Sequence, residues 1–400
     1  MCINPRVLIL RNERGVKDEL RKIGVSQQAL KILAPKAFHY LIKLEGIPSP
    51  IANLLKQEMV SVMADAAISK KMTSFTSKKS DVLLIGTEAQ LKKLLRRLNR
   101  QRFNLPGVSR KLSELIKNFK RERFVLSFKE KKMDLARKVA VMGILNLTPD
   151  SFYNGGKYAA ESRALKRAEE MLKEGADLID IGGESTRPGA KEVRVEEEIR
   201  RVIPVISKIR DLFEVPLSID TYKAKVAKEA LEAGVDMVND ISGLRFDPQL
   251  KEIVARFRAG VVLMHIKGTP RDMQNSPQYG SLMGEIISYL SESIRLAQTT
   301  GIDLEKIAVD PGIGFGKTVE HNLQILNHLG ELRSLGRPIL IGASRKSFIG
   351  AILGLPLEER LEGSLAAASL AVMQGAKIIR THDVKPTRRA VDLTQAIIQS

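Results

Sequence analysis

The sequence predicts an α/β protein, a (β/α)8 TIM barrel preceded by a smaller α/β or α+β domain. From residue 138 onward, short β-branched runs alternate with helical patterns, and eight such units over about 260 residues fit one barrel. Residues 1–137 contain 30 Lys and Arg against 12 Asp and Glu, whereas residues 138–400 contain 35 against 34. The net charge of +19 therefore lies almost entirely in the first third, which we interpret as a separate domain.

Short runs rich in Val, Ile and Leu are predicted to be the barrel strands. In chain order they are Val139–Leu145, Leu178–Ile181, Leu217–Ile219, Met237–Val238, Val261–Met264, Ile307–Val309, Ile339–Ile341 and Lys377–Ile379. The helical patterns between and after them are Ser162–Glu174, Val195–Leu212, Lys223–Ala233, Pro248–Phe257, Met283–Gln298, Val319–Leu329, Leu361–Gln374 and Lys385–Ile398. A doubly wound open sheet is the alternative, because strand order is not visible in a sequence. The eight regular strand–helix units and the lack of a dinucleotide-binding fingerprint favour a closed barrel over an open sheet.

The first third carries its own strand and helix signals. Predicted strands are Arg6–Leu10 and Val82–Ile85, and predicted helices are Pro50–Asp65 and the basic Ala89–Asn99. We expect a domain over residues 1–128, a charged linker over residues 129–137, and the barrel over residues 138–400.

Three roles are open for this basic domain. It could be a structural appendage that docks on the barrel or on its dimer partner, or it could bind nucleic acid or an anionic surface through residues 1–137. It carries no obvious aromatic RNA-binding signature. A second catalytic domain is the third interpretation, disfavoured because the single histidine, His39, has no evident partners and no phosphate loop is present.

Composition excludes several classes of protein. A single cysteine, Cys2, excludes a disulfide framework and a multi-cysteine metal site. No apolar run reaches the roughly 18–20 residues that span a bilayer, and residues 1–10 lack the features of a secretory signal. We therefore expect a cytoplasmic protein with no membrane partner.

Polar and glycine-rich residues follow every predicted barrel strand, where a TIM barrel carries its chemistry. In strand order they are Asn146, the run Gly182–Arg187, Asp220, Asn239 with Asp240, His265, Asp310–Gly312, Ala343–Lys346 and Arg380–Asp383. An isolated Asp or Ser is more often a helix cap. Eight consecutive strand ends of this kind predict a site.

The residue types in this ring suggest the ligands that it could hold. Asp220, Asn239 and Asp310 suit a flat heterocycle with several N–H edges. The cations suit a phosphate or diphosphate, and they are Arg187, Lys346, Arg380 and His382. The helix that begins near Ser347 could hold a carboxylate, and the Asn146 oxygen could join water and diphosphate around Mg²⁺.

Structural interpretations compete at several positions. His265 is as consistent with a packed core histidine as with a ligand, and Asp180 and Asp240 could simply cap or brace loops. The glycine-rich run Asp310–Thr318 is not a P-loop, because Pro311 stands where that motif needs glycine.

The ordered motifs resemble the dihydropteroate synthase family over essentially all of residues 138–400, but not over residues 1–137. The matching segments are Met142–Phe152, Asp180–Ala190, Ser218–Thr221, Val238–Gly243, Asp310–Thr318, Gly342–Phe348 and Arg380–Val384. The resemblance implies a homodimeric, Mg²⁺-dependent transferase of folate biosynthesis. Such an enzyme condenses 6-hydroxymethyl-7,8-dihydropterin diphosphate with 4-aminobenzoate, giving 7,8-dihydropteroate and diphosphate.

The same resemblance implies residue roles. The substrate-binding set is Thr186, Arg187, Asp220, Asn239, Asp310, Phe315, Lys346, Ser347, Arg380, Thr381 and His382, with Pro188 also lining the aminobenzoate pocket. The catalytic set within it is Asp220, Asp310, Lys346, Arg380 and His382, and the metal ligand is Asn146.

One position departs from the family pattern, and two other functions are open. Asn154 stands before Gly155 and Gly156 where the family commonly has a second Asp in the first loop, so we expect a tuned enzyme. A pterin-binding methyltransferase domain is one alternative, disfavoured because both diphosphate-facing segments are present and no corrinoid-binding motif is found. The other is a basic RNA-binding or scaffold protein with an inactive barrel.

Overall fold

The chain forms two compact units, Met1–Ile116 and Lys117–Ser400. The computed structural model describes residues 4–10, 12–70, 78–101, 105–147, 157–185, 189 and 192–400, and for residues 157–160 the backbone only. The boundary lies before the expected one after residue 128, so the expected division is corrected. The reason is that β4 (Val125–Phe128), expected in the first domain, and β5 (Lys131–Asp134), expected in the linker, pair as a hairpin of the second unit.

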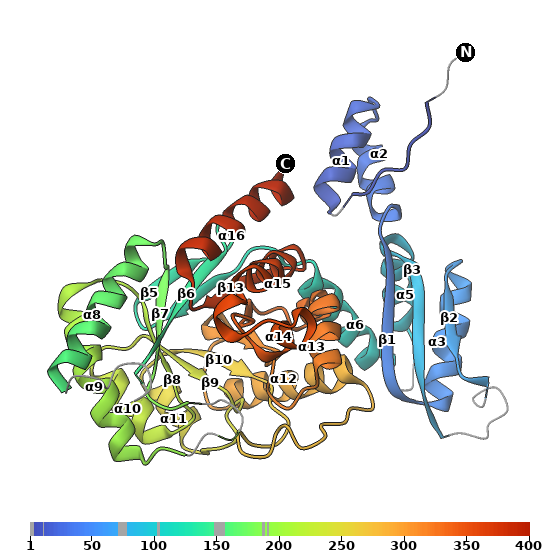
Figure 1. The fold of residues 1–400 in the computed structure, drawn as a ribbon. Coiled ribbons are helices and arrows are strands. Elements are labelled where there is room, and N and C mark those ends of the chain that lie inside the picture. The colour runs from blue at the N-terminus through green and yellow to red at the C-terminus, as the bar shows by residue number, and fades with distance from the viewer. Residues whose placement is uncertain are drawn as a thin grey trace. The chain divides into compact units, whose positions relative to one another are not determined.

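The first unit is built on a three-stranded antiparallel sheet in the order β1-β3-β2 (Figure 1). Its elements are α1 (Glu13–Lys22), α2 (Gln27–Leu33), η1 (Ala34–Lys36), β1 (His39–Pro48), α3 (Ser49–Ser61), β2 (Asp65–Ile68), β3 (Lys79–Thr87), α5 (Glu88–Leu98) and α6 (Leu105–Phe119), within which the unit boundary falls. Alternate strand residues, among them Ile42 and Leu84, share a core with Leu55 of α3 and Leu94 of α5. The strand period of two thus buries one face of the sheet under helices.

The predictions for this unit have mixed outcomes. Val82–Ile85 lies within β3, and Ala89–Asn99 corresponds to α5, which starts at a Thr87 capping box. The helix predicted over Pro50–Asp65 is shorter, because its last residue begins β2. The strand predicted over Arg6–Leu10 is wrong, because the described residues of that segment form no strand.

The second unit is a closed barrel of eight parallel strands in chain order, which confirms the predicted TIM barrel and excludes the open sheet. The strands are β6 (Ala140–Asn146), β7 (Leu178–Gly182), β8 (Leu217–Asp220), β9 (Met237–Asp240), β10 (Gly260–Met264), β11 (Ile307–Asp310), β12 (Ile339–Ile341) and β13 (Ala376–Thr381). The helices outside them are α8 (Lys157–Lys173), α9 (Val195–Leu212), α10 (Ala224–Glu232), α11 (Leu250–Arg256), α12 (Leu282–Thr299), η2 (Leu304–Lys306), α13 (Val319–Asn327), η3 (Leu329–Leu335), α14 (Ser347–Leu353), η4 (Leu357–Glu359), α15 (Leu361–Met373) and α16 (Val384–Gln399). Each predicted strand matches an observed strand to within a few residues.

The hairpin β4–β5 closes the amino-terminal end of the barrel. Phe128 and Leu126 are buried in one cluster with Met142, Leu178 and Val262, which point into the barrel interior. Strand residues of the opposite parity, such as Ile179, instead pack outward against the helices. Because one end is filled, an open site can lie only at the carboxyl end of the strands. Among the described residues, no helix combines the length and apolarity needed to cross a membrane.

Candidate active site

Polar residues from adjacent strands form one row at the carboxyl end of the barrel. In the register of β6 to β9, Asn146 pairs with Gly182, Gly182 with Asp220, and Asp220 with Asn239. Asp310 ends β11 in the same way. The predicted convergence therefore follows from strand register, because neighbouring parallel strands end at the same edge.

Asp180 and Arg380 tie this row together. Arg380 Nε donates to Asp180 Oδ2 at 2.6 Å, and its Nη2 donates to Asp220 Oδ2 at 2.7 Å. Asn239 Nδ2 donates to the same Asp180 oxygen at 3.0 Å. Asp180, which from the sequence could have been only a loop brace, is fully buried at the centre of the site.

Asp220 offers an acceptor that the protein leaves unused. Burial raises the pKa of its carboxyl above the usual range, the Arg380 guanidinium opposes that rise, and Asp180 adds to it. For Arg380 burial acts to lower the pKa, but Asp180 and Asp220 raise it overall, so the guanidinium stays charged. Among the described residues, Asp220 Oδ1 is buried without a hydrogen-bond partner. A buried acceptor of this kind is costly unless a bound molecule donates to it.

Asp310 and Lys346 lie on the opposite side of the barrel mouth, and each shifts the pKa of the other. Asp310 Oδ1 accepts from the backbone N–H of Gly312 at 2.7 Å, and burial raises its pKa against the effect of Lys346. Lys346 Nζ donates to the Ile313 carbonyl and lies 4.6 Å from the centroid of the Phe315 ring. Burial lowers the pKa of Lys346 to about 8, which Asp310 opposes. The cation and the aromatic ring therefore meet beside a buried carboxylate.

His265 is a packed core histidine. It is buried, and its Nδ1 lies 2.9 Å from Nζ of the buried Lys317, which also donates to the Phe315 carbonyl at 2.8 Å. Burial lowers the pKa of His265 to about 2 and that of Lys317 well below its usual range. Lys317, which was not singled out from the sequence, thus fixes the backbone that carries Phe315.

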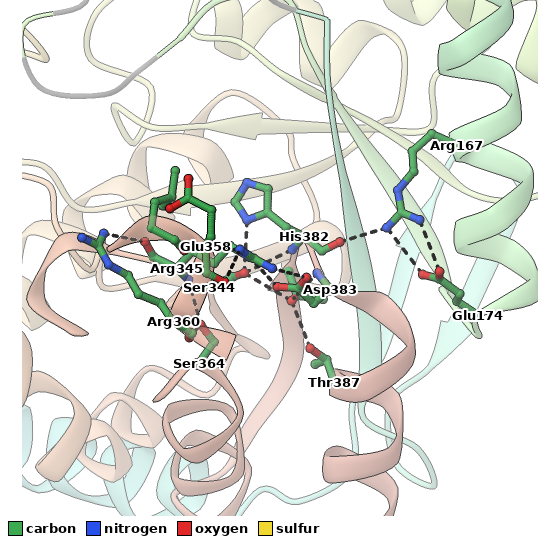
Figure 2. Close-up of polar contacts among 12 residues, drawn as sticks. Arg167, Glu174, Ser344, Arg345, Glu358, Arg360, Ser364, His382, Asp383 and Thr387 are labelled. Carbon is green, nitrogen blue, oxygen red and sulfur yellow. Dashed lines mark hydrogen bonds and ion pairs between the residues drawn. The ribbon is translucent and has the colours of Figure 1, made fainter. Parts of the chain in front are cut away.

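His382 stands in a turn that is bonded from several sides. Figure 2 shows its Nδ1 facing Ser344 Oγ, at 3.1 Å, and its carbonyl accepting from Arg167 at 3.0 Å. Arg345 donates two hydrogen bonds of 2.8 Å to the carboxylate of the next residue, Asp383. Bidentate pairs of this kind fix orientation as well as distance.

The remaining predicted residues have different outcomes. Ser347 begins α14, as expected. The hydroxyl of Thr381 is buried and lies 3.0 Å from that of Thr387, so it braces the turn after β13. Asp240 braces its loop through the N–H and hydroxyl of Ser242, as the structural interpretation expected. Four predicted positions lie outside the described residues, and they are Asn154, Thr186, Arg187 and Pro188.

A buried charge cluster fixes both ends of the loop that follows β7. Lys223 Nζ lies 2.8 Å from Glu184 Oε2, 2.7 Å from Glu198 Oε2 and 2.6 Å from the Val193 carbonyl. The second oxygen of Glu184 accepts from the Val193 N–H at 3.0 Å. Glu184 and Val193 stand on the two sides of the loop, so one lysine holds both of its stems. No local pattern in the sequence predicts this contact, because Lys223 lies 25 or more positions after the residues that it joins.

The residues present fit a magnesium ion held mainly by other oxygens. Asn146 Oδ1 would lie 3.4 Å from a Cβ atom added to Gly182, so the amide oxygen faces the row beside Asp220. Among the described residues, no group of three or more His, Cys, Asp or Glu side chains could hold a metal. Mg²⁺ commonly keeps several waters and takes substrate phosphate oxygens, so Asn146 would have to supply only one of its oxygen ligands.

Known proteins are similar to this chain mainly over the barrel. A family model described as Pterin binding enzyme matches residues 142–382. A dihydropteroate synthase from Synechocystis is 47% identical over 265 residues, which is 66% of this chain and 92% of that protein. The crystal structure of Yersinia pestis dihydropteroate synthase with a sulfonamide drug aligns at a TM-score of 0.66 and 46% identity, covering 69% of this chain and all of that one.

One relative also matches the first unit. A probable bifunctional folylpolyglutamate synthase/dihydropteroate synthase from Halobacterium salinarum is 38% identical over 380 residues, which is 95% of this chain and 45% of that protein. The expectation that the family resemblance stops before residue 138 therefore does not hold for this relative. The family match, the relatives and the geometry agree, and the chain belongs to the pterin-binding enzyme family, within which it is a dihydropteroate synthase.

Proposed function

We propose that the row from Asn146 to Asn239, together with Asp310, Lys346 and Arg380, binds a dihydropterin diphosphate and transfers its methylene carbon to 4-aminobenzoate. The C–O bond to diphosphate breaks and a C–N bond to the arylamine forms. The arylamine releases one proton, and diphosphate leaves. No covalent enzyme intermediate is part of this proposal.

The pterin ring is assigned to the acidic row. The observation that carries this proposal is the buried, unpartnered Oδ1 of Asp220, which lies next to the Asn239 amide in the strand register. A pterin presents N–H donors along one edge, and carboxylate and amide oxygens are their natural partners. Asp310, on β11, offers a second carboxylate.

Bond breaking is assigned to charge stabilisation on two sides. Asp220 and Asp310 would stabilise the electron-poor methylene carbon, while Arg380, His382 and Arg187, the last of which is not among the described residues, would stabilise the leaving diphosphate. Asn146 would hold Mg²⁺, which when bound would supply positive charge at the diphosphate oxygens.

The aminobenzoate is assigned to the side that carries Phe315. The ring of Phe315 lies under the Lys346 ammonium, and Ser347 begins α14, whose free N–H groups suit a carboxylate. The arylamine is neutral at pH 7, so it needs positioning more than deprotonation before it attacks. Pro188 is assigned to the same pocket.

Direct assay tests this proposal. Purified protein is incubated with the pterin diphosphate, 4-aminobenzoate and Mg²⁺, and dihydropteroate is measured by chromatography. We expect product that depends on all three additions. Product formation without the diphosphate group on the pterin, or none with all components, would overturn the proposal.

The assembly and location of the enzyme are further proposals supported by the family resemblance. We propose a homodimer that acts in the cytoplasm, and light scattering of the purified chain tests the first statement. Nucleic-acid binding through residues 1–137 is supported only by the basic composition of that segment, so we do not assign it.

A further inference from the structure

The first unit contains five of the six elements of a known supersecondary fold. Its strands and helices run β1, α3, β2, β3, α5, and the sheet order is β1-β3-β2. The split βαβ fold has the same start and ends with one more strand. In this chain α5 is followed by helix α6 instead of that strand. Among the described residues, β1 therefore has β3 on one side and no strand on the other.

The exposed edge belongs to the longest strand of the sheet. β1 has 10 residues, whereas β2 has 4. The sheet face turned away from the helices is partly apolar, since Leu41 is 66% exposed and pairs with the half-buried Ile85. A long strand edge beside apolar side chains is a ready template for another strand.

The same unit exposes a segment with the composition of a strand. Residues 6–10 read Arg-Val-Leu-Ile-Leu, yet Val7 is 91% and Ile9 is 89% exposed, and Leu8 is 46% exposed. β-branched residues in alternation favour a pleated, half-buried setting. Adjacent aliphatic side chains left this open to water mark a contact site.

We infer that residues 5–10 of one copy of this chain add to the free edge of β1 in a second copy, and complete a four-stranded sheet there. In the single chain, Asn12, two residues after the segment, caps α1 with its side chain, and Figure 1 shows the segment next to α2 with no strand beside it. In the sequence, α1 and α2 lie between the segment and β1. Identical copies can exchange the segment reciprocally, which closes the pair and covers the β1 edge in both copies.

Cross-linking of two differently tagged copies tests the exchange. Both copies carry Cys2→Ser; one carries Ile9→Cys and the other Leu41→Cys, and they are mixed with a short bismaleimide. We expect a heterodimer band. The matched control replaces Ile9→Cys by Ile23→Cys and should give little of that band, since Ile23 is also highly exposed (75%, against 89% for Ile9) but lies outside the segment.

Hydrogen exchange of the full-length chain gives a second, local readout. We expect the backbone amides of residues 5–10 and of β1 to exchange slowly. This protection should be lost from both segments in the double variant Val7→Lys/Ile9→Lys and kept in Ile23→Lys. Synthase activity should be unchanged in all of these variants, because every substituted residue belongs to the first unit and the polar row belongs to the second. No heterodimer band above the level of the Ile23→Cys control, or rapid exchange in β1 of the unaltered protein, would overturn the inference.

Discussion

At the scale of single residues, the two oxygens of Asp220 have different surroundings. One accepts from Arg380, and the other is buried with no partner among the described residues. Asp180 gives Arg380 a second anchor, so the guanidinium would keep a carboxylate if Asp220 lost its charge. The site can therefore lose the Asp220 charge without losing its framework.

We predict that Asp220→Asn lowers kcat by about 10²–10³-fold while the protein stays folded, because the variant removes charge next to the reacting carbon but keeps the shape. Steady-state kinetics and thermal unfolding measure the two effects. Asp211→Asn, on a helix outside the barrel, is the control. Turnover within a few-fold of the unaltered enzyme would contradict the assigned role.

Lys346 gives the enzyme a predicted alkaline limit. Its pKa is lowered to about 8 in the folded protein, so its charge is present below that pH and is lost above it. We expect kcat/KM to fall above about pH 8 and the fall to move to higher pH in Lys346→Arg. A pH profile identical in both enzymes would rule Lys346 out as its origin.

Between about pH 8 and 10.5 the unfolded chain holds the Lys346 proton and the folded chain does not, so Lys346 alone makes folding more favourable as pH rises.

At the scale of elements, Lys223 holds together the stems of the loop after β7. Its ammonium is buried between Glu184 and Glu198, and desolvation raises the pKa of Glu198 against the effect of Lys223. Removing one partner of a buried ion pair leaves an uncompensated charge.

We predict that Lys223→Met lowers the free energy of unfolding by about 3–5 kcal/mol and raises KM for the diphosphate substrate more than KM for aminobenzoate. Lys225→Met is the matched control, since Lys225 is 59% exposed and pairs with an exposed Glu196. Denaturant unfolding and substrate titrations measure the effects. Equal losses in both variants would show that burial of the lysine is not the cause.

The hairpin β4–β5 has a structural role that can be separated from catalysis. Phe128 is 1% exposed at the closed end of the barrel, far from the polar row in the strand register. Phe128→Ala should cost about 3–5 kcal/mol of stability and leave KM unchanged. Val125→Ala on the same strand, where the side chain is 38% exposed, should cost much less. Chemical denaturation of the two variants provides the comparison.

At the scale of the whole molecule, the second unit holds every site residue that the structure describes. We predict that a chain starting at Lys117 keeps synthase activity, whereas one starting at residue 138 unfolds readily, because it lacks the hairpin that fills the barrel end. Activity assays and thermal unfolding of both truncated chains distinguish the two boundaries. If the chain starting at residue 138 were fully stable, the domain boundary would lie where the charge distribution predicts it, before residue 138.

The sequence by itself determined the barrel, its strands and the strand ends at which polar residues such as Asp220 and Asp310 stand. It could do so because eight strand–helix units follow one another locally, and strand ends such as Asp220 and Asp310 can be read directly from the pattern. The predicted strand at Arg6–Leu10 failed for the opposite reason. A strand needs a neighbour, and within the described part of one chain that segment has none.

Only the tertiary structure decided which polar residues touch. Asp180 and Arg380 are 200 positions apart, and the Lys223 cluster joins three separate segments, so no local pattern could pair them. The structure also places residues 125–134, which were expected in the first domain and the linker, in the same unit as the barrel, because the burial of Phe128 depends on strands that come later in the chain. Local periodicity fixes elements, whereas closure of the barrel fixes distances between residues far apart in sequence.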